Sequence, residues 1–420
     1  MLNSPSAIGM RRSFGFGDWL GLATTGHVLA ARQSPEIAPF FLQRTPHSWD
    51  QAGKAGRDSI RDTVEIVRSS GYSQAWGADA DGLDSIEAIY QASASGYTWL
   101  SLDVSSSVGS DADLLDESAL RERVAVLEAE GAFEGFDWKE YYIGRFFSVG
   151  HRINPLQFDE EDLMRAAVKY ARATLLAEKW ALEASRGCAG RPFEIEISVA
   201  GAAAVTTPLD HLFLALELQR RGIPGLIALG LHYEGQFIPG IDFQGDAKKF
   251  EDRLKIHVGI AKFAGPYKLS FHHAADKFAL YPVIGRLCGN MLHLKTASTS
   301  YLEALRVVAR TDGPLFAEIA NFSRSRINDP ALMSRTLLTG HQLAVLPPAR
   351  DGEDEDTYLD HLTGRQLLAA TGPVVLSEGV SSGGHSFRNR LRETVSRRGD
   401  LYAEILERHF LRHFSLLNAG

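Results

Sequence analysis

One local pattern recurs along the chain: a short apolar run, then a polar or glycine-containing break, then an amphipathic stretch with helical spacing. Short apolar runs suit strands buried on both faces of a sheet, and the amphipathic stretches suit helices that cover it. Strands that alternate with helices in this way form parallel sheets. We expect strands at 19–24, 97–104, 193–199, 226–232, 267–272, 291–294 and 343–346. The alternating order predicts an α/β fold, a TIM-type (β/α) barrel with inserted helical segments.

Helix signals mark the stretches between these strands. Residues with helical spacing run over 160–185, over 208–221 behind the cap Thr207 and the first-turn residue Pro208, and over 300–310 behind Thr299. A last helix over 390–417 carries apolar side chains at helical spacing, which fits core packing or a subunit contact. We expect a single barrel domain over 1–420, with a helical insertion at 105–134 and a C-terminal helical extension at 386–420.

Charge and cysteine content narrow the range of partners. The 420 residues hold 44 Lys and Arg against 52 Asp and Glu, a formal net charge of −8, without a block of basic residues. Nucleic acids and anionic membranes need a concentrated positive surface, so we expect neither partner. No apolar stretch approaches the ~18 residues of a spanning helix, and Cys188 and Cys288 stand apart from any metal or disulfide motif. These features predict a cytoplasmic protein that acts on small molecules.

Histidine and lysine side chains lie at the ends of three predicted strands. Side chains alternate along a strand, so His293 and Lys295 share one face, while His272 and His232 end two further strands. In a parallel barrel these ends meet at the pocket. Histidine with carboxylates is the donor set that Mn, Co, Ni or Zn accept, whereas Ca and Mg prefer oxygen alone. A hydrogen-bonded structural imidazole is the alternative for each histidine, and Lys295 suits a salt-bridged core lysine, a carboxylate anchor or a Schiff-base amine.

Carboxylates also fall at unusual positions. The predicted strand 193–199 aligns Glu194 and Glu196 on one face, although a strand buried on both sides is expected to be apolar. The stretch 76–81 places two aspartates two residues apart, a spacing that fits a capped helix start or an oxygen-ligand metal loop. No Gly-x-Ser-x-Gly, P-loop or His-Glu-x-x-His motif occurs, which disfavours serine hydrolases, nucleotide hydrolases and zincins.

Five segments spread along the chain carry a family resemblance. They are FGFGDWLGLAT at 14–24, WGADAD at 76–81, GIDFQGD at 240–246, YKLSFH with DKF inside 267–278, and HLKTASTSYLEAL at 293–305. In these segments the chain resembles the metal-dependent tagaturonate epimerases of bacterial hexuronate catabolism. The resemblance implies interconversion of D-tagaturonate and D-fructuronate, a divalent transition metal and a TIM-type barrel.

The resemblance and the strand-end positions together suggest roles for ten residues. We expect catalytic roles for Lys295, His293 and Asp276, metal binding by His272, His232 and Asp242, and substrate binding by Lys277, His273, Asp81 and Thr296. The two sugar acids differ at a carbon β to the ketone, where removal of the carbon-bound proton gives no enolate. We therefore expect metal-stabilised retro-aldol cleavage, rotation of the aldehyde and re-addition. Migration of the ketone through successive enediols is the alternative.

The chain departs from the family pattern at two places. Where the resemblance predicts an Asp-Glu pair after the third predicted strand, the chain has Ala200 and Gly201. In the turn after the fifth predicted strand, the expected Ser-Gly-Ser is His-Ala-Ala at 273–275. These changes make the chain a divergent member and leave two other functions open: a sugar isomerase or aldolase on a related ketose, and a non-catalytic sugar-acid-binding protein. The expected partner is a small sugar acid, and the apolar last helix permits a homo-oligomer.

Overall fold

Eight parallel strands close into a barrel in the computed structural model, which describes residues 4–45, 56–188, 190–326, 329–333, 336–350, 355–381 and 383–419. Each strand pairs with the next one along the chain, and the last pairs with the first. The strands are β1 (Ser13–Gly17), β2 (Ala38–Arg44), β3 (Gly77–Leu83), β4 (Trp99–Asp103), β5 (Glu194–Ser198), β6 (Leu226–Gly230), β7 (Lys268–Phe271) and β8 (Leu292–Thr296). The predicted TIM-type barrel is confirmed.

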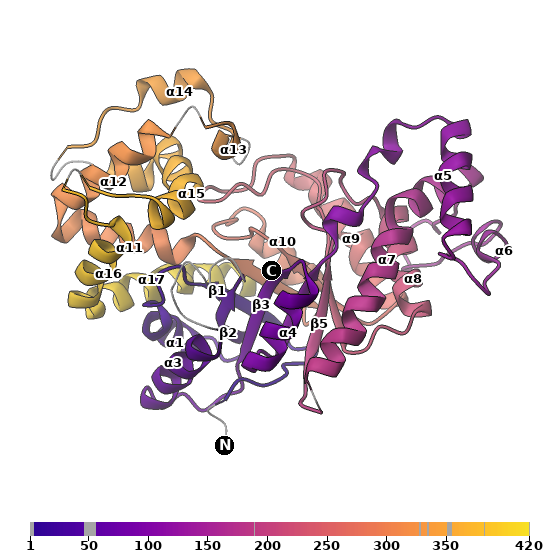
Figure 1. Ribbon diagram of the computed structural model, residues 1–420, viewed down its shortest axis with the longest axis horizontal. Helices are drawn as coiled ribbons and strands as arrows, with labels where there is room; N and C mark the ends of the chain where they lie inside the picture. The colour runs from indigo at the N-terminus through magenta and orange to yellow at the C-terminus, as the bar shows by residue number, and fades with distance from the viewer. Residues whose placement is uncertain are drawn as a thin grey trace.

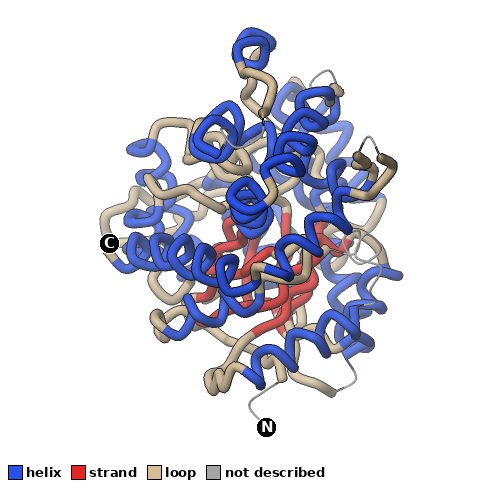
Figure 2. The backbone as a smooth tube through the Cα atoms, turned by 90° about the vertical axis from the view of Figure 1, so that its left-hand side faces the viewer, coloured by secondary structure: helices blue, strands red, loops and turns tan. Residues whose placement is uncertain are grey.

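Helices enclose the barrel, as the blue tube around the red strands shows in Figure 2. Up to β8 they are α1 (Thr24–Arg32), α3 (Gly56–Ser69), α4 (Ile86–Ser95), α5 (Glu117–Ala129), α6 (Trp138–Tyr142), α7 (Glu160–Cys188), α8 (Pro208–Arg220), α9 (Ala247–Phe263) and α10 (Tyr281–Cys288). After β8 they are α11 (Thr299–Thr311), α12 (Gly313–Ser325), α13 (Pro330–Met333), α14 (Gly340–Val345), α15 (Leu362–Ser377), α16 (Phe387–Arg397) and α17 (Gly399–Asn418). Two short 3-10 helices, η1 (Ser105–Ser107) and η2 (Ser110–Leu114), follow β4, and a π-helical turn, η3, spans Asp356–Asp360. Within the described part of the chain, none of these helices is both long and apolar enough to cross a membrane.

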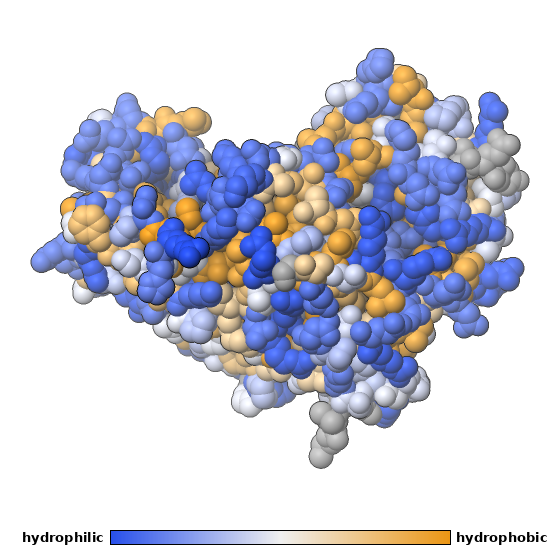
Figure 3. All heavy atoms as spheres, turned by 180° about the vertical axis from the view of Figure 1, so that it is seen from behind, coloured by the Kyte–Doolittle hydropathy of each residue, from blue (hydrophilic) through white to orange (hydrophobic). Residues whose placement is uncertain are grey.

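Two helical lobes rise beside the carboxyl ends of the strands (Figure 1). One lobe comes from the connection between β4 and β5 and holds α5 and α6, and the other follows β8 and holds α12 to α15. Seen from behind, the surface is hollowed between the two lobes (Figure 3). The carboxyl ends of the strands point toward this hollow, which is the face where barrel enzymes build their sites.

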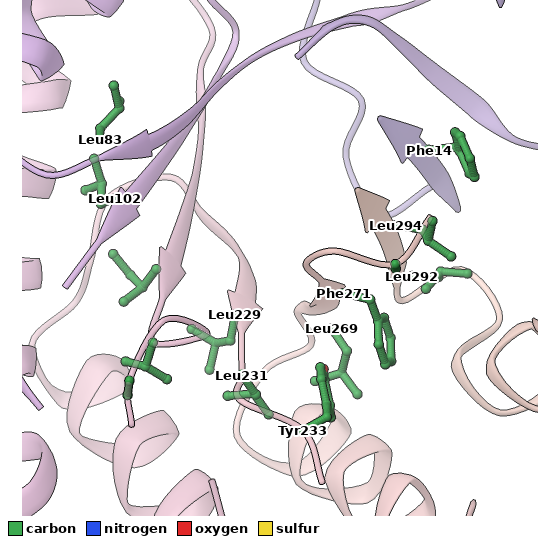
Figure 4. Packing of buried hydrophobic residues seen from close by; sticks show 14 of the residues in the cluster. Phe14, Leu83, Leu102, Leu229, Leu231, Tyr233, Leu269, Phe271, Leu292 and Leu294 are labelled. Carbon is green, nitrogen blue, oxygen red and sulfur yellow. The ribbon is translucent and has the colours of Figure 1, made fainter. Parts of the chain in front are cut away.

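The outward faces of the strands are apolar and covered by helices. Leu229, Leu269 and Leu292 are fully buried, and Figure 4 shows them in the layer between the strands and the helices outside them. In the same layer the rings of Tyr233 and Phe271 are stacked, with centroids 4.4 Å apart. Burial of apolar surface at ~25 cal/mol per Å² makes this layer the main source of stability.

The inward faces hold a separate, smaller apolar cluster in the amino-terminal half of the barrel. Its members are Ile8, Ala38, Phe40, Trp99 and Ala228. The Glu194 carboxylate accepts hydrogen bonds from the backbone N–H groups of Ile8 and Gly9, so the N-terminal segment closes this end. The inward positions nearer the carboxyl end are mostly polar, which concentrates the charged side chains at the hollow.

Two predicted strands are wrong, and three real strands were not predicted. Residues 19–24 form a bend that leads into α1, and residues 343–346 lie at the end of α14. The strands β1, β2 and β3 are the ones that the pattern did not reveal. β3 reads Gly-Ala-Asp-Ala-Asp-Gly-Leu, so its aspartates and glycines hide the apolar run expected of a buried strand. The interpretation of 76–81 as a helix start or a metal loop is therefore wrong, because residues 77–81 belong to strand β3.

The predicted helices are largely confirmed. α7, α8 and α11 cover the expected ranges, and Thr207 caps α8 through reciprocal hydrogen bonds with Asp210. Thr299 is the first residue of α11 rather than its cap. The single helix expected over 390–417 is wrong, because Arg398 leaves the helical conformation (φ −120°, ψ 32°) and separates α16 from α17. The segment 105–134 contains η1, η2 and α5.

Candidate active site at the carboxyl end of the barrel

Lys295 stands among three carboxylates inside the barrel. Its Nζ atom lies 2.9 Å from Asp79 Oδ2, 2.8 Å from Asp81 Oδ1 and 3.0 Å from Glu196 Oε2. The carboxylates come from β3 and β5 and the lysine from β8, so closure of the sheet brings them together. Burial alone would lower the pKa of Lys295, but the three carboxylates raise it above its usual value. The amine is therefore held as an ammonium ion, which matches a salt-bridged lysine and disfavours a neutral Schiff-base amine.

Two neutral side chains fix these carboxylates. Ser101 Oγ lies 3.1 Å from Asp79 Oδ1 and 3.2 Å from Glu196 Oε2. Trp99 Nε1 donates to the same Glu196 oxygen over 3.1 Å, and Lys295 donates to Ser101 Oγ. Buried charges persist in a fold only when they are paired and hydrogen-bonded in this way. Together with His272, the charged residues form what we call the axis cluster: Asp79, Asp81, Glu196, His272 and Lys295.

His272 and Glu196 form an ion pair in the axis cluster, with His272 Nε2 in direct contact with Glu196 Oε1. Gly230 makes room for this contact, because a Cβ at residue 230 would lie 2.8 Å from both of these atoms. Burial opposes both charges. Even so, Glu196 raises the pKa of His272, and Lys295 and His272 hold the pKa of Glu196 well below its usual range. The contact therefore stabilises the charged forms of both side chains, an imidazolium facing a carboxylate.

The axis cluster has an accessible part and a buried part. The side chains of Asp81 and His272 are 17% and 16% exposed, whereas those of Asp79 and Glu196 are fully buried. Burial raises the pKa of Asp79 to about 7, although Lys295 opposes the shift. For Asp81, burial acts in the same direction, but Lys295 and His272 lower its pKa. Neighbouring carboxyl groups whose pKa values are pushed apart are the arrangement that acid–base catalysis uses.

His293 and Thr296, two more residues of β8 with predicted roles, are buried below the hollow. His293 Nδ1 lies 2.9 Å from Ser13 Oγ, and its Nε2 lies 4.0 Å from Asp79 Oδ2. Burial lowers the pKa of His293 well below its usual value, so the ring is neutral. Thr296 Oγ1 donates to the Gly15 carbonyl oxygen over 2.8 Å, a bond that joins β8 to β1. The structure thus places His293 beside the axis cluster and turns the Thr296 hydroxyl toward the backbone.

The three predicted metal ligands do not meet. His272 belongs to the axis cluster, whereas His232 Nδ1 lies 2.7 Å from the carbonyl oxygen of Ala202. The Asp242 carboxylate accepts hydrogen bonds from the backbone N–H groups of Phe243 and Ala279. Among the described residues, these three do not form a set whose ligand atoms lie within 4.8 Å of one another.

Two predicted substrate-binding residues lie in the turn after β7. Lys277 is buried, and its Nζ atom donates to three backbone carbonyls, those of Ile238, Ile241 and Ala275. His273 is exposed, and its φ of 51° places it in the left-handed region that non-glycine residues rarely adopt. Lys277 therefore ties the loop after β6 to the turn after β7.

Asp276 was expected to be catalytic, and it lies in a second cluster that joins this turn to α17. Its Oδ1 lies 2.7 Å from His409 Nε2 and 3.3 Å from His413 Nε2. Its Oδ2 lies 2.7 Å from Arg365 Nη2, which is also 3.4 Å from Glu303 Oε1. Burial opposes ionisation, but Arg365 and His409 hold the pKa of Asp276 well below its usual range. We call these five residues the flank cluster.

The partners of Asp276 were missed by sequence reasoning. His409 and His413 lie one helical turn apart on α17. Their i, i+4 spacing in the sequence predicts that both side chains lie on the same face of a helix. No sequence pattern indicates the contact between Arg365 and Asp276, because the two residues are 89 positions apart.

A cavity of about 660 Å³ borders the flank cluster. The loops after β6 and β7, α11, the start of α15 and α17 line it. We call it the flank cavity. Asp242, Asp276 and His409 are among its lining residues, so two of the predicted site residues face this space rather than the barrel axis.

Comparison with known proteins identifies the family. The family model of tagaturonate epimerases matches residues 1–417. The chain belongs to the tagaturonate epimerase family. A tagaturonate/fructuronate epimerase of Thermotoga maritima is 32% identical over 416 residues, which make up 98% of this chain and 82% of that relative.

Solved structures of a family relative share the fold. The fructuronate-tagaturonate epimerase of Cohnella laeviribosi, crystallised with one glycerol, matches with a TM-score of 0.90 at 29% identity, over 99% of this chain and 83% of that one. Its native crystal structure gives a TM-score of 0.89 at 30% identity, with the same coverage. The TIM-type barrel is therefore common to this chain and a crystallised relative.

The departure at Ala200 and Gly201 lies directly after β5. The Gly201 N–H donates to Ser105 Oγ over 3.0 Å. Asp103 Oδ2, from the end of β4, lies 3.8 Å from the position that a Cβ of residue 201 would occupy. The Asp103 carboxylate of β4 thus lies beside residues 200 and 201, the positions where the family resemblance predicts an Asp-Glu pair.

The axis cluster does not fit a divalent metal. The Lys295 ammonium lies between its three carboxylates, where a metal ion bound by them would have to lie. Within the described residues, three ligand atoms lie within 4.8 Å of one another in the flank cluster, where Asp276, His409 and His413 meet. One carboxylate and two imidazoles form a donor set that Mn, Co, Ni or Zn accept.

The outer nitrogens of these two histidines also have partners. His413 Nδ1 lies 3.0 Å from the carbonyl oxygen of His409, and His409 Nδ1 lies 3.5 Å from Glu303 Oε1. Contacts to a carbonyl or a carboxylate orient the imidazoles of metal sites and select the nitrogen that faces the ion. These contacts favour Asp276, His409 and His413 as a metal-ligand set, in which Asp276 also pairs with Arg365 and His413 Nε2 accepts a hydrogen bond from the Asp276 N–H over 3.3 Å.

Proposed function

We propose that this chain interconverts D-tagaturonate and D-fructuronate, the activity named for its relatives from T. maritima and C. laeviribosi. The observation that carries the proposal is the axis cluster. In a member of this family, it places ionised acid–base groups at the carboxyl end of a closed barrel. Its accessible residues, Asp81 and His272, carry opposite charges, so one can accept a proton while the other donates one.

The chemistry that we propose is retro-aldol cleavage followed by re-addition. The Asp81 carboxylate accepts the proton of the substrate hydroxyl next to the bond that breaks, and that oxygen becomes an aldehyde. The electron pair of the broken carbon–carbon bond passes toward the ketone oxygen, which takes a proton from the His272 imidazolium. After the aldehyde rotates, the bond forms on its other face and both protons return to their donors. The cycle consumes no cofactor equivalent and releases no net proton.

Lys295 acts in this scheme as a positioning residue. Its side chain is 2% exposed, and its ammonium is occupied by carboxylates of the chain itself. It holds the Asp81 carboxylate in the ionised form that can accept a proton. Its effect on the reaction therefore passes through Asp81 and Glu196 rather than through contact with the sugar.

We also propose that Asp276, His409 and His413 hold a divalent ion, with Mn, Co, Ni and Zn as the candidates. The donor set and the supporting contacts of the flank cluster favour this assignment. When bound, such an ion supplies Lewis-acid polarisation to an oxygen atom of a ligand in the flank cavity. The residues themselves tie α17 to the turn after β7.

An NMR time course with D-fructuronate tests the proposed function. The protein is loaded in turn with Mn, Co, Ni or Zn and compared with a chelator-treated sample. We expect D-tagaturonate to appear in at least one metal-loaded sample. Absence of conversion with every metal would overturn the epimerase proposal and leave a different ketose substrate or a binding role. Equal conversion in the chelated sample would show that the axis cluster turns over without the flank ion, and would leave that ion a role in binding or stability.

A Schiff-base aldolase is the alternative that chemical trapping tests directly. The carboxylates around Lys295 hold its amine protonated, and a protonated amine does not attack a carbonyl group. We therefore expect borohydride to leave the protein mass unchanged after incubation with D-fructuronate. A reduced sugar adduct on Lys295, found by peptide mass spectrometry, would favour the aldolase.

A further inference from the structure

The flank cavity is separate from the barrel axis. It has a volume of about 660 Å³ and lies between the loops after β6 and β7 and the C-terminal helix α17. Among the described residues that line it, none belongs to the axis cluster. A ligand in this cavity would therefore bind apart from the acid–base groups of the barrel.

The inner wall of the flank cavity is neutralised by its own ion pairs. Arg365 pairs with Asp276 at 2.7 Å and with Glu303 at 3.4 Å. Arg306 pairs with Glu303 at 2.8 Å and with Asp360 at 2.7 Å. Each of these three acids thus has a guanidinium partner within the wall.

Arg408 and Arg412 supply positive charge that the wall does not use. They lie one turn apart on α17, line the flank cavity and are exposed. Within the described part of the chain, neither has a carboxylate oxygen within 4.0 Å. The Arg412 guanidinium lies 3.9 Å from the centroid of the Phe278 ring, which also lines the cavity. Stacking on a ring holds a guanidinium by its face and leaves its N–H edge for an acid group.

Hydrogen-bond acceptors line the same cavity. Asp242 and Asp360 contribute carboxylates, and Gly240 contributes backbone. A carboxylate oxygen accepts more than one hydrogen bond, so Asp242 and Asp360 can receive hydroxyl donors in addition to their present partners. The cavity thus offers carboxylate oxygens that can accept hydrogen bonds and the guanidiniums of Arg408 and Arg412. This combination suits a ligand that has hydroxyl groups as well as an acid group.

We propose that the flank cavity binds a small hydroxylated anion, a sugar acid or a sugar phosphate, whose acid group is held by Arg408 and Arg412. Guanidiniums on adjacent helical turns match the paired oxygens of a carboxylate or a phosphate. The hydroxyl groups of the ligand then meet the carboxylates of Asp242 and Asp360. Sugar acids and sugar phosphates share this chemistry, and two arms of one experiment distinguish them.

Calorimetric titration of the full chain tests this site with four probes: D-gluconate, D-glucose 6-phosphate, inorganic phosphate and neutral sorbitol. We expect one of the two sugar anions to bind, and the tighter of them identifies the acid group. Binding of that anion should weaken at least tenfold in the variant R408Q/R412Q. The control R121Q/R123Q removes two exposed arginines of α5 and should bind like the wild type. Inorganic phosphate should bind more weakly than the preferred sugar anion, and sorbitol should not bind.

Three results would overturn the proposal: equal affinity of the wild type and R408Q/R412Q, no binding of either sugar anion, or inorganic phosphate binding as tightly as the sugar anion. Both arginines are exposed, so we expect the double variant to fold, and an unchanged melting temperature verifies this. The titration requires no turnover. Its outcome is therefore independent of whether the chain is an epimerase.

Discussion

The axis cluster and the flank cluster both bury a cation among carboxylates, but they balance their charges differently. On the axis, the ammonium of Lys295 serves three acids at once. On the flank, arginines, which stay charged at every physiological pH, surround the acids. Burial raises the pKa of Asp79 on the axis to about 7, because the shared ammonium offsets burial only in part, while Arg365 and His409 hold the pKa of Asp276 on the flank well below its usual range.

This difference separates a cluster suited to proton transfer from one suited to binding. On the axis, the accessible Asp81 carboxylate can accept a proton and the accessible His272 imidazolium can donate one. Carboxylates that are held ionised beside fixed cations instead provide a constant electrostatic environment for a ligand or a metal. Substitutions that remove the central cation of each cluster should therefore have different consequences, one for turnover and the other for stability.

Replacing Lys295 by Met should give the largest effect. Without the ammonium, three neighbouring carboxylates cannot all stay ionised in their present positions, so the proton acceptor at Asp81 is lost. We expect kcat/KM for D-fructuronate to fall by about 10³-fold. NMR turnover assays measure this. The control is K268M, which removes another buried lysine whose Nζ contacts Ser13. An equal loss in both variants would mean that any buried lysine has this effect.

Replacing Arg365 by Met should act mainly on stability. The change leaves Asp276 and Glu303 without their shared guanidinium, and removing one partner of a buried ion pair costs roughly 3–5 kcal/mol. Urea unfolding measures the cost, with the exposed Arg397→Met as a control. We expect turnover per folded molecule to stay within about tenfold of the wild type. Loss of turnover with unchanged unfolding would instead place the flank cluster in the reaction and erase the contrast with the axis.

The last five strands of the barrel were predictable from the sequence, and the first three were not. β4 to β8 contain apolar runs that the expected strands covered. β1 carries glycines, and β3 carries the aspartates of the axis cluster, so neither reads as a buried strand. Polar residues that serve a functional site interrupt the hydrophobic pattern of the strand or helix to which they belong. The strands that escaped prediction thus include the one that supplies two acids to the site.

The candidate site was predictable where one strand or one resembling segment carried the signal. Alternation along β8 pointed to Lys295, and strand-end position pointed to His272. The resembling segment 76–81 pointed to Asp81, but the inward position of Asp79 beside Lys295 could not be inferred, because their contact depends on a strand that was not recognised. The flank cluster depends on contacts such as that between Asp276 and His409, which are 133 residues apart. No local pattern encodes a contact of that range.

Substituting Gly230 by Ala tests how closely the axis cluster is fitted. The new Cβ would lie 2.8 Å from Glu196 Oε1 and from His272 Nε2, so the ion pair has to open. A displacement of about 1 Å can cost up to 10²-fold in rate, and we expect kcat/KM to fall by about 10- to 100-fold. The control is G399A, since a Cβ at residue 399 meets nothing within 4 Å. Wild-type turnover in G230A would show that the contact between Glu196 and His272 does not serve the reaction.

A divalent metal should stabilise the chain through the flank cluster. An ion that binds only the folded chain adds about 2.7 kcal/mol at a free concentration of 100 times its Kd. We expect one of Mn, Co, Ni or Zn to raise the melting temperature, a chelator to reverse the rise, and H413Q to lose it. The control is H232Q, which changes a histidine outside the triad. If H232Q loses the rise and H413Q keeps it, the metal lies near His232 instead.

The smallest expected effect is a pH dependence of stability in the flank cluster, measured with chelator present. Burial opposes a charge on His409, but Glu303 and Asp276 raise its pKa in the folded chain. The resulting stabilisation is complete below the unfolded value of about 6.5 and is lost as the pH rises through the folded value. The unfolding free energy of the wild type relative to H409Q should thus be largest at about pH 6 and below, and shrink as the pH rises above the unfolded value. The exposed control H151Q should show no such trend. A difference that grows with pH would mean that His409 is neutral beside Asp276, so that arginine alone balances this carboxylate.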